Sequence, residues 1–170
     1  MAIRNEGANP TDITLTTIGV PTHAPEQSGY GYRIDRAYFT MEGAVADDAI
    51  RMGDRYVAVL TVTPFENAEA RLMVNDPLPA GFEIDNPNLL RSGDIKAMDW
   101  LKSVETEHTE FRADRFLAAV DWRGSTPFRL AYVVRAVSPG QFHHSAASVE
   151  DMYRPQFRAI SATGRIIITE

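Results

Sequence analysis

One stretch, residues 127–140, constrains the fold more strongly than any other part of the sequence. Apolar residues alternate along it with the period of two that is typical of a strand with one buried face. That face carries Phe128, Leu130, Tyr132, Val134 and Ala136. The opposite face mixes arginine with valine and alanine, which predicts that it is only partly covered. Pro139 and Gly140 end the strand, and its length and apolarity are more typical of the centre of a sheet than of an edge.

Length and composition bound the class of protein. The chain has 170 residues, which suits one domain, or one domain with an extra arm. Its net charge of -6 argues against a nucleic-acid groove and against binding to anionic lipid. Because no apolar run is long enough to span a bilayer, we expect no direct membrane insertion. Cysteine is absent, which excludes disulfides, zinc–thiolate sites and a Cys nucleophile.

Further alternating segments predict the other strands. These segments are 13–20, 32–41, 55–65, 68–75, 105–112, 115–122, 156–160 and 164–169. Residues 142–152 are interpreted as a loop or a short extended piece. The short link Glu66-Asn67 predicts that 55–65 and 68–75 form an antiparallel hairpin, and Gly124-Ser125-Thr126 predicts a second one that leads into the opening strand.

The pattern as a whole predicts an all-β, antiparallel β-sandwich of eight or nine strands. One short helix is expected near residues 94–102, where apolar residues recur at intervals of three. Residues 1–29 are interpreted as an N-terminal arm with a first short strand, and residues 30–170 as the sandwich domain. Its core is expected to contain the inward aromatic residues Tyr38, Tyr56, Phe116, Trp122, Phe128 and Tyr132.

Two adjacent histidines, His143 and His144, are the first candidates for chemistry. Neighbouring side chains on a strand point to opposite faces, so these two would rarely bind one metal together. A metal site would also need further ligands, such as Glu150 or Asp151. We therefore favour a solvated loop over a metal site, and we predict no cofactor.

An acidic cluster is the second candidate, and it consists of Glu105, Glu107, Glu110 and His108. Paired carboxylates perform acid–base catalysis only in a concave site where their pKa values are shifted. Here they alternate along a polar segment, as on the solvated face of a strand. The sequence also lacks a nucleophile elbow and a phosphate-binding glycine loop, so we predict that the chain is not an enzyme.

The most distinctive polar and aromatic patch is residues 151–155, which carry Asp151, Met152, Tyr153 and Arg154 before a proline. Tyrosine and arginine together are favoured at protein interfaces, so one interpretation is a contact surface. The other is a structural corner, in which the Tyr153 ring lies under the loop while Asp151 and Arg154 pair across it. Both interpretations stay open from the residues alone.

Five ordered stretches carry a resemblance to a known family. They are GDRYV at 53–57, DPLPAGFE at 76–83, EFRADRF at 110–116, AYVVRAVSPG at 131–140 and VEDMYRP at 149–155. In this order they resemble the C-terminal, macroglobulin-like domain of bacterial α2-macroglobulins, over roughly residues 30–170. The resemblance implies a β-sandwich without catalytic residues, in a large periplasmic protease trap that is often anchored to the inner membrane.

The resemblance also implies partners. The domain is expected to dock on neighbouring domains, above all a thioester domain, and to hold the resting state of the trap. Target proteases would be met through the full-length protein, which is thought to act beside a penicillin-binding protein. The residues proposed for the interdomain contact are Asp151, Met152, Tyr153, Arg154, Phe82 and Glu83.

A second function class stays open at this stage, namely a free-standing adhesive or carbohydrate-binding sandwich on the cell surface. Such sites usually present exposed tryptophan or tyrosine beside carboxylates. The sequence has two tryptophans, of which Trp122 is expected in the core and Trp100 is the one available for exposure.

Overall fold

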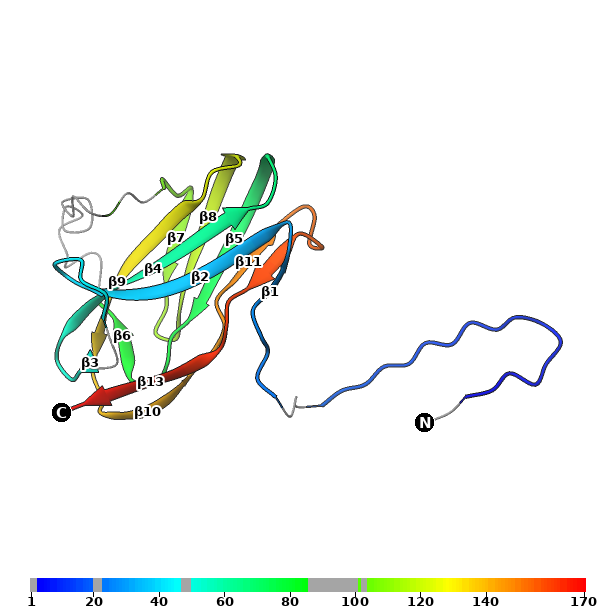
Figure 1. The fold of residues 1–170 in the computed structure, drawn as a ribbon, viewed down its shortest axis with the longest axis horizontal. Coiled ribbons are helices and arrows are strands. Elements are labelled where there is room, and N and C mark those ends of the chain that lie inside the picture. The colour runs from blue at the N-terminus through cyan, green and yellow to red at the C-terminus, as the bar shows by residue number, and fades with distance from the viewer. Residues whose placement is uncertain (1–2, 20–22, 47–49, 86–100, 102–103) are drawn as a thin grey trace.

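The computed structural model describes residues 3–19, 23–46, 50–85, 101 and 104–170, and these form an all-β body with an extended N-terminal arm (Figure 1). The strands are β1 (Ser28–Tyr30), β2 (Tyr32–Thr40), β3 (Ile50–Arg51), β4 (Arg55–Pro64), β5 (Ala68–Pro77), β6 (Phe82–Ile84), β7 (His108–Phe111), β8 (Arg115–Gly124), β9 (Phe128–Ala136), β10 (Gly140–His144), β11 (Ser148–Asp151), β12 (Arg158–Ile160) and β13 (Gly164–Thr169).

Three sheets build the body. A six-stranded sheet in the order β1-β12-β11-β5-β8-β7 packs against a four-stranded sheet in the order β2-β4-β9-β6, and a small sheet β10-β13-β3 lies at one end (Figure 1). Among the described strands, all pairings are antiparallel except that of β13 with β3. The predicted antiparallel β-sandwich is therefore confirmed.

Strand β9 covers most of residues 127–140, and it lies between β4 and β6 as expected for a central strand. The residues of its inward face, from Phe128 to Ala136, are all buried. Its outer face is partly covered, as predicted, because Val57, Val59 and Leu101 form a second buried cluster that Ala131 joins. The helix expected near 94–102 lies outside the described residues, apart from Leu101.

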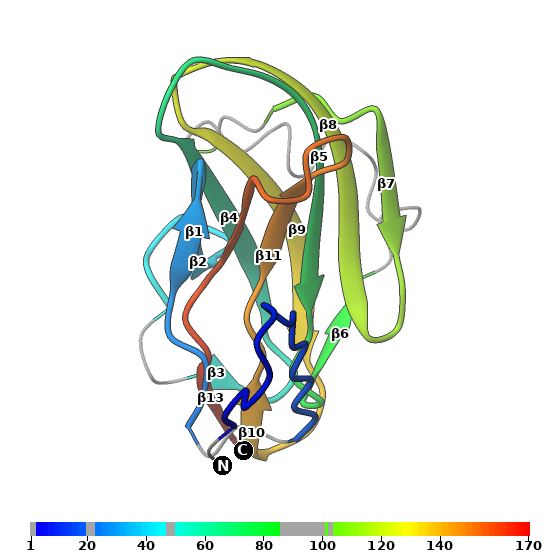
Figure 2. The same ribbon diagram turned by 90° about the vertical axis from the view of Figure 1, so that its right-hand side faces the viewer.

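Both predicted hairpins are wrong. Strands β4 and β5 lie in different sheets, and so do β8 and β9, so each short link crosses from one sheet to the other. Figure 2 shows both crossings at the same end of the sandwich. Alternation shows which face of a strand is buried, but it does not show which strand lies beside it. Here the two strands joined by each link turn their apolar faces towards the one core that the two sheets share.

Two segment assignments also need correction. Residues 13–19 form no strand and are exposed, whereas the first strand of the sheet is β1, whose three residues pair with β12. Residues 142–152 contain the end of β10 and the whole of β11, separated by a short link. Their alternation was hidden because His144 and Asp151 are polar residues at buried positions.

A buried polar network joins the two main sheets. The Arg36 guanidinium on β2 pairs with the Asp76 carboxylate on β5 at 2.5 Å, and both side chains are almost completely buried. The Tyr132 hydroxyl on β9 donates to the second carboxylate oxygen of Asp76 at 2.7 Å. The Arg36 guanidinium also donates to the carbonyl oxygen of Ser145 at 2.8 Å. A buried charge is tolerated only when it is paired and hydrogen-bonded, and both conditions are met here.

Aromatic packing surrounds this network. The rings of Phe116 and Tyr132 stack with centroids 4.4 Å apart, so the two sheets touch directly beside Asp76. Trp122 packs on Phe128 at 4.5 Å and is half-buried against the core. The predicted aromatic core is confirmed, with Trp122 at its margin.

Tyr132 allows packing and hydrogen bonding to be separated by mutation. We expect Tyr132→Ala to lower the free energy of unfolding by about 3–5 kcal/mol, because it removes a buried ring. Tyr132→Phe should cost about 1–3 kcal/mol, because Asp76 loses one donor while the ring stays. Urea unfolding followed by circular dichroism measures both, with the exposed Tyr30→Phe as the control. An unchanged midpoint for Tyr132→Ala would contradict this account of the core.

Candidate functional site

Residues 151–157 form a corner between β11 and β12, and one buried carboxylate organises it. The Asp151 side chain is buried, and its Oδ1 accepts hydrogen bonds from the backbone N–H groups of Tyr153 at 3.0 Å and Arg154 at 3.2 Å. Its Oδ2 accepts from Nε of Arg154 at 2.8 Å. An Asp that bonds backbone two and three residues ahead fixes a turn locally.

The corner is also fixed to the strands around it. The backbone N–H of Met152 donates to the carbonyl of Arg71 at the start of β5, and the Arg154 guanidinium donates to the carbonyl of Glu69 at 3.1 Å. Arg154 lies over the Phe157 ring, 4.9 Å from its centroid. That ring contacts Gly31, whose φ of +78° and lack of a Cβ allow the close approach. The corner is therefore a rigid part of the sandwich.

Two large side chains project from this rigid corner. Tyr153 is 75% exposed and Met152 is 52% exposed. The Asp151–Arg154 pair expected for a structural corner is present, but the Tyr153 ring does not lie under the loop. Asp151 and Arg154 therefore form the frame of a corner, while a contact role for the exposed Met152 and Tyr153 stays a prediction.

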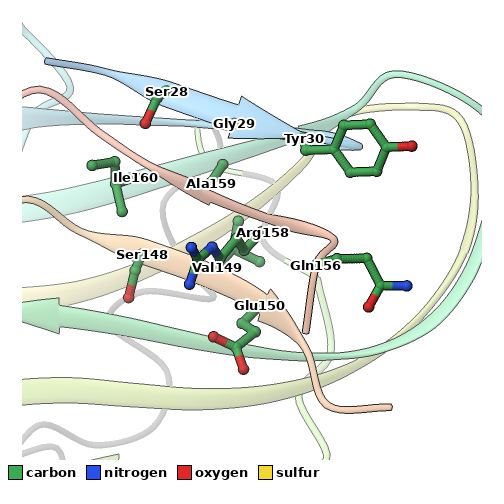
Figure 3. Close-up of a pocket in the computed structure, with 10 residues that line it drawn as sticks. All are labelled: Ser28, Gly29, Tyr30, Ser148, Val149, Glu150, Gln156, Arg158, Ala159 and Ile160. Carbon is green, nitrogen blue, oxygen red and sulfur yellow. The ribbon is translucent and has the colours of Figure 1, made fainter. Parts of the chain in front are cut away.

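An open trough of about 700 Å³ lies beside the corner, along β1, β12 and β11 (Figure 3). Glu150 and Arg158 are direct register partners across β11 and β12 and place opposite charges in it. Tyr30 stands at the end of β1 and Gln156 on the corner itself (Figure 3). The trough is open and is lined by both polar and apolar groups, so it suits contact with another surface better than enclosure of a small molecule.

A second hollow, of about 370 Å³, lies against the same corner, and its lining combines aromatic side chains with charged ones. Tyr30 and Phe157 lie with ring centroids 5.1 Å apart, and Phe65 on the β4–β5 crossing is 59% exposed. We define the corner surface as four exposed side chains, Met152 and Tyr153 on the corner itself and Tyr30 and Phe65 at the adjoining hollow. Tyr30 and Phe65 are remote from 151–155 in sequence, so their part in this surface was not predicted, and no local pattern marks them.

The other two predicted contact residues lie elsewhere. Met152 bonds the start of β5, whereas Phe82 follows the end of that strand, so β6 and the corner stand at different ends of the sandwich (Figure 2). Phe82 is only 3% exposed and packs on Tyr38, with ring centroids 5.3 Å apart. Phe82 is therefore a core residue, while Glu83 beside it is exposed.

The interpretation of the two histidines as part of a solvated loop is wrong, because both lie on strand β10, where their side chains point to opposite faces. His143 is exposed, whereas His144 is buried and its Nε2 lies 3.1 Å from the Tyr38 hydroxyl. Burial, and then the positive charge of Arg36, lower the pKa of His144 to about 3, so the imidazole is neutral at neutral pH. Within the part of the chain that the structure describes, no three His, Asp or Glu side chains converge on a possible metal position.

The acidic cluster forms surface ion pairs. Glu110 pairs with Arg112 at 2.8 Å, and Glu107 lies 3.4 Å from Arg71. The hydrogen bond from Arg112 lowers the pKa of Glu110, whereas a general acid needs a raised pKa. No helix in the described ranges has the length and apolarity to cross a membrane.

His144 gives the domain a specific pH dependence. The folded state holds this group neutral down to a pKa of about 3, but the unfolded chain takes up its proton near the ordinary value of 6.5. Its stabilising contribution is therefore complete above pH 6.5 and is lost progressively as the pH falls towards 3. At pH 5 we expect a loss of about 2 kcal/mol.

The variant His144→Gln isolates this contribution, because glutamine does not titrate. Urea unfolding at pH 7.5 and pH 5 should show a smaller decline for His144→Gln than for the unmodified chain. Equal declines in the two proteins would show that His144 does not cause the acid sensitivity. His143→Gln, at the exposed neighbouring position, is the matched control. It should leave the decline in stability between pH 7.5 and pH 5 as large as in the unmodified chain.

The corner predicts a contrast between two neighbouring substitutions. Asp151→Ala should destabilise the isolated domain by about 1–3 kcal/mol, because it leaves buried donors without their acceptor. Tyr153→Ala should change the free energy of unfolding by no more than about 0.5 kcal/mol, as for most surface sites. Chemical denaturation measures both, with Glu150→Ala as an exposed control. A cost for Tyr153→Ala as large as that for Asp151→Ala would place the ring in the fold and not on the contact surface.

Solved structures of bacterial α2-macroglobulins share this fold. The native conformation of the Escherichia coli protein superimposes with a TM-score of 0.78 at 32% identity and covers 89% of this chain. A crystal structure of a Salmonella α2-macroglobulin mutant gives a TM-score of 0.77 at 35% identity over the same share. In both, the match covers 10% of the larger chain.

Curated relatives agree with the structures. Alpha-2-macroglobulin of Escherichia coli strain K12 is 32% identical over 99% of this chain, and that of Xylella fastidiosa strain 9a5c is 31% identical over 95%. The chain spans 11% and 10% of the lengths of these relatives. The family model described as the bacterial alpha-2-macroglobulin MG10 domain matches residues 31–156. The resemblance noted in the sequence is thus confirmed, and the chain belongs to the MG10 domain family of bacterial α2-macroglobulins.

Proposed function

We propose that this chain is a non-catalytic module of a longer bacterial α2-macroglobulin, and that the corner surface docks on a neighbouring domain to hold the resting state. One observation carries the proposal: Met152 and Tyr153 are exposed on a corner that the buried Asp151 carboxylate holds rigid. We infer that the neighbour is the thioester domain, as the family resemblance implies.

Physical reasoning supports docking at this place. Binding costs free energy whenever a loop or a flexible side chain has to be ordered, and a pre-formed corner avoids most of that cost. Aromatic residues, methionine and arginine are the residue types that concentrate at interface centres. The corner surface combines Tyr153, Tyr30 and Phe65 with Met152, while polar side chains of the trough supply a rim.

The family membership supports a proposal for the activity of the parent protein. Among the related structures, the Escherichia coli protein is described once as trypsin activated and once as activated by porcine elastase. We propose that the parent likewise inhibits proteases by trapping them, that it acts in the periplasm from an inner-membrane anchor, and that a penicillin-binding protein works beside it. This domain would meet proteases only as part of the full-length protein.

The docking proposal is tested in the full-length parent. We expect Tyr153→Ala and Met152→Ala to lower the melting temperature of the resting form by several degrees while leaving that of the isolated domain almost unchanged. The physical reason is that both side chains would be buried only in the interdomain contact. Calorimetry of the two proteins measures the difference, and native gel mobility before and after trypsin reports the state of the parent.

Met52→Ala is the matched control, because Met52 is 46% exposed but lies in the turn between β3 and β4, away from the corner. This substitution should change the melting temperature of neither the full-length parent nor the isolated domain. If Tyr153→Ala lowers the melting temperature of parent and isolated domain equally, Tyr153 acts only within the fold and the docking proposal fails.

A further inference from the structure

Met152 has the most exposed side chain among the methionines that the structure describes. Those methionines are Met41, Met52, Met73 and Met152, and Met41 is partly buried. The exposed fractions of the other three side chains are 46% for Met52, 36% for Met73 and 52% for Met152. A thioether in contact with solvent can be reached by oxidants, which convert methionine to its sulfoxide. Met152 is therefore open to a modification that burial would slow.

The backbone around Met152 is held in place while the side chain faces solvent. Its N–H group donates to the Arg71 carbonyl at 2.8 Å, and the neighbouring Asp151 carboxylate fixes the turn that follows. Met52 lies instead in the turn before β4, and Met73 lies within β5. Of the described methionines, only Met152 belongs to the corner surface. Its modification would therefore change that surface and leave the frame of the corner in place.

We propose that Met152 is a methionine-oxidation site for hydrogen peroxide, and that its sulfoxide weakens docking of the corner surface on the neighbouring domain. This inference rests on the proposed function, because it concerns regulation of the same surface. In the reaction, the thioether sulfur attacks one oxygen of the peroxide, so that an S–O bond forms and the O–O bond breaks. The sulfur loses two electrons, and the second oxygen takes up the remaining proton and leaves as water.

The sulfoxide differs from the thioether in what its burial costs. Oxidation turns a flexible apolar side chain into a polar one, and its new oxygen accepts hydrogen bonds. In an interdomain contact that oxygen would lose its water, and without a donor on the neighbouring domain its burial is unfavourable. In the isolated domain the oxygen would stay in solvent, because half of the Met152 side chain is exposed. Oxidation should therefore weaken the contact and leave the stability of the isolated domain unchanged.

Docking and oxidation of the corner oppose each other. A docked corner would shield the sulfur of Met152, so the resting parent would react only during the time that the corner is released. The sulfoxide, once formed, favours the released state by as much as it weakens the docked one. Oxidation would then hold the corner in its released state until the sulfoxide is reduced again.

Peptide mass spectrometry after a timed pulse of hydrogen peroxide tests the shielding. In the 170-residue chain we expect Met152 to be oxidised as fast as Met52, or faster. In the resting full-length parent, Met152 should react at least ~10-fold more slowly than in this chain, because only released corners react. Met52 should react at similar rates in both proteins. Equal rates for Met152 in the two proteins would show that the corner is not docked and would overturn the proposal.

Substitutions at Met152 test whether the sulfoxide itself matters. After prolonged treatment with peroxide and removal of the oxidant, calorimetry compares each full-length protein with its own untreated sample. The melting temperature of the resting form should fall by several degrees in the unmodified parent, but clearly less in Met152→Leu, whose side chain takes up no oxygen. Met52→Leu, the matched control, should lose as much as the unmodified parent. Met152→Gln, which is polar without oxidation, should melt below Met152→Leu before any peroxide is added.

The same measurements separate this inference from the docking proposal. Tyr153→Ala can lower the melting temperature of the parent alone while peroxide acts equally on the unmodified parent and on Met152→Leu. The corner would then dock, but oxidation of Met152 would not regulate it, and this inference would fail by itself. If Tyr153→Ala instead changes the parent no more than the isolated domain, docking is absent and both proposals fail.

Discussion

The ion pair between Arg36 and Asp76 is the interaction on which the arrangement of the two main sheets depends. Each partner comes from a different sheet, and Tyr132 and the Ser145 carbonyl complete their hydrogen bonds. Desolvating two charges is costly, so the pair is tolerated only when its geometry is kept. A shift of one sheet by a single residue would leave both charges buried without partners. The network therefore fixes the position of one sheet relative to the other. This role is larger than its net contribution to the free energy of unfolding.

The fold was predictable where a strand's own residues determine its environment. Alternation from Phe128 to Ala136 indicated a buried face, and the structure places that strand at the centre of its sheet. The partners of strands were not predictable in the same way. Glu66-Asn67 is short enough for a hairpin, but it links two sheets, and only the shared core decides between these outcomes. Polar residues at inward positions, such as His144, hid β10 because their partners are remote in sequence.

The candidate site was likewise predictable from the sequence only in part. The residue types at 151–155 indicate an interface or a corner, and the structure shows the Asp151–Arg154 pair of a corner beside two exposed side chains, Met152 and Tyr153. The hydrogen bonds of Asp151 hold the turn, while the side chains of Met152 and Tyr153 stay exposed. Phe82, which the sequence also suggests as a contact residue, fills the core at the other end of the sandwich. The aromatic neighbours Tyr30 and Phe65 reach the corner only through the tertiary fold.

The pairing of β1 with β12 has a consequence for biosynthesis. Ser28 and Ile160 are partners in the sheet, although almost the whole domain separates them along the chain. Contacts of this range form late and slowly, because the loop that they close must first be ordered. A ribosome has to release nearly all of this domain before its first strand can find its neighbour. Until then the edge of β12 that β1 covers is unpaired, and unpaired strand edges make incompletely folded chains prone to aggregation.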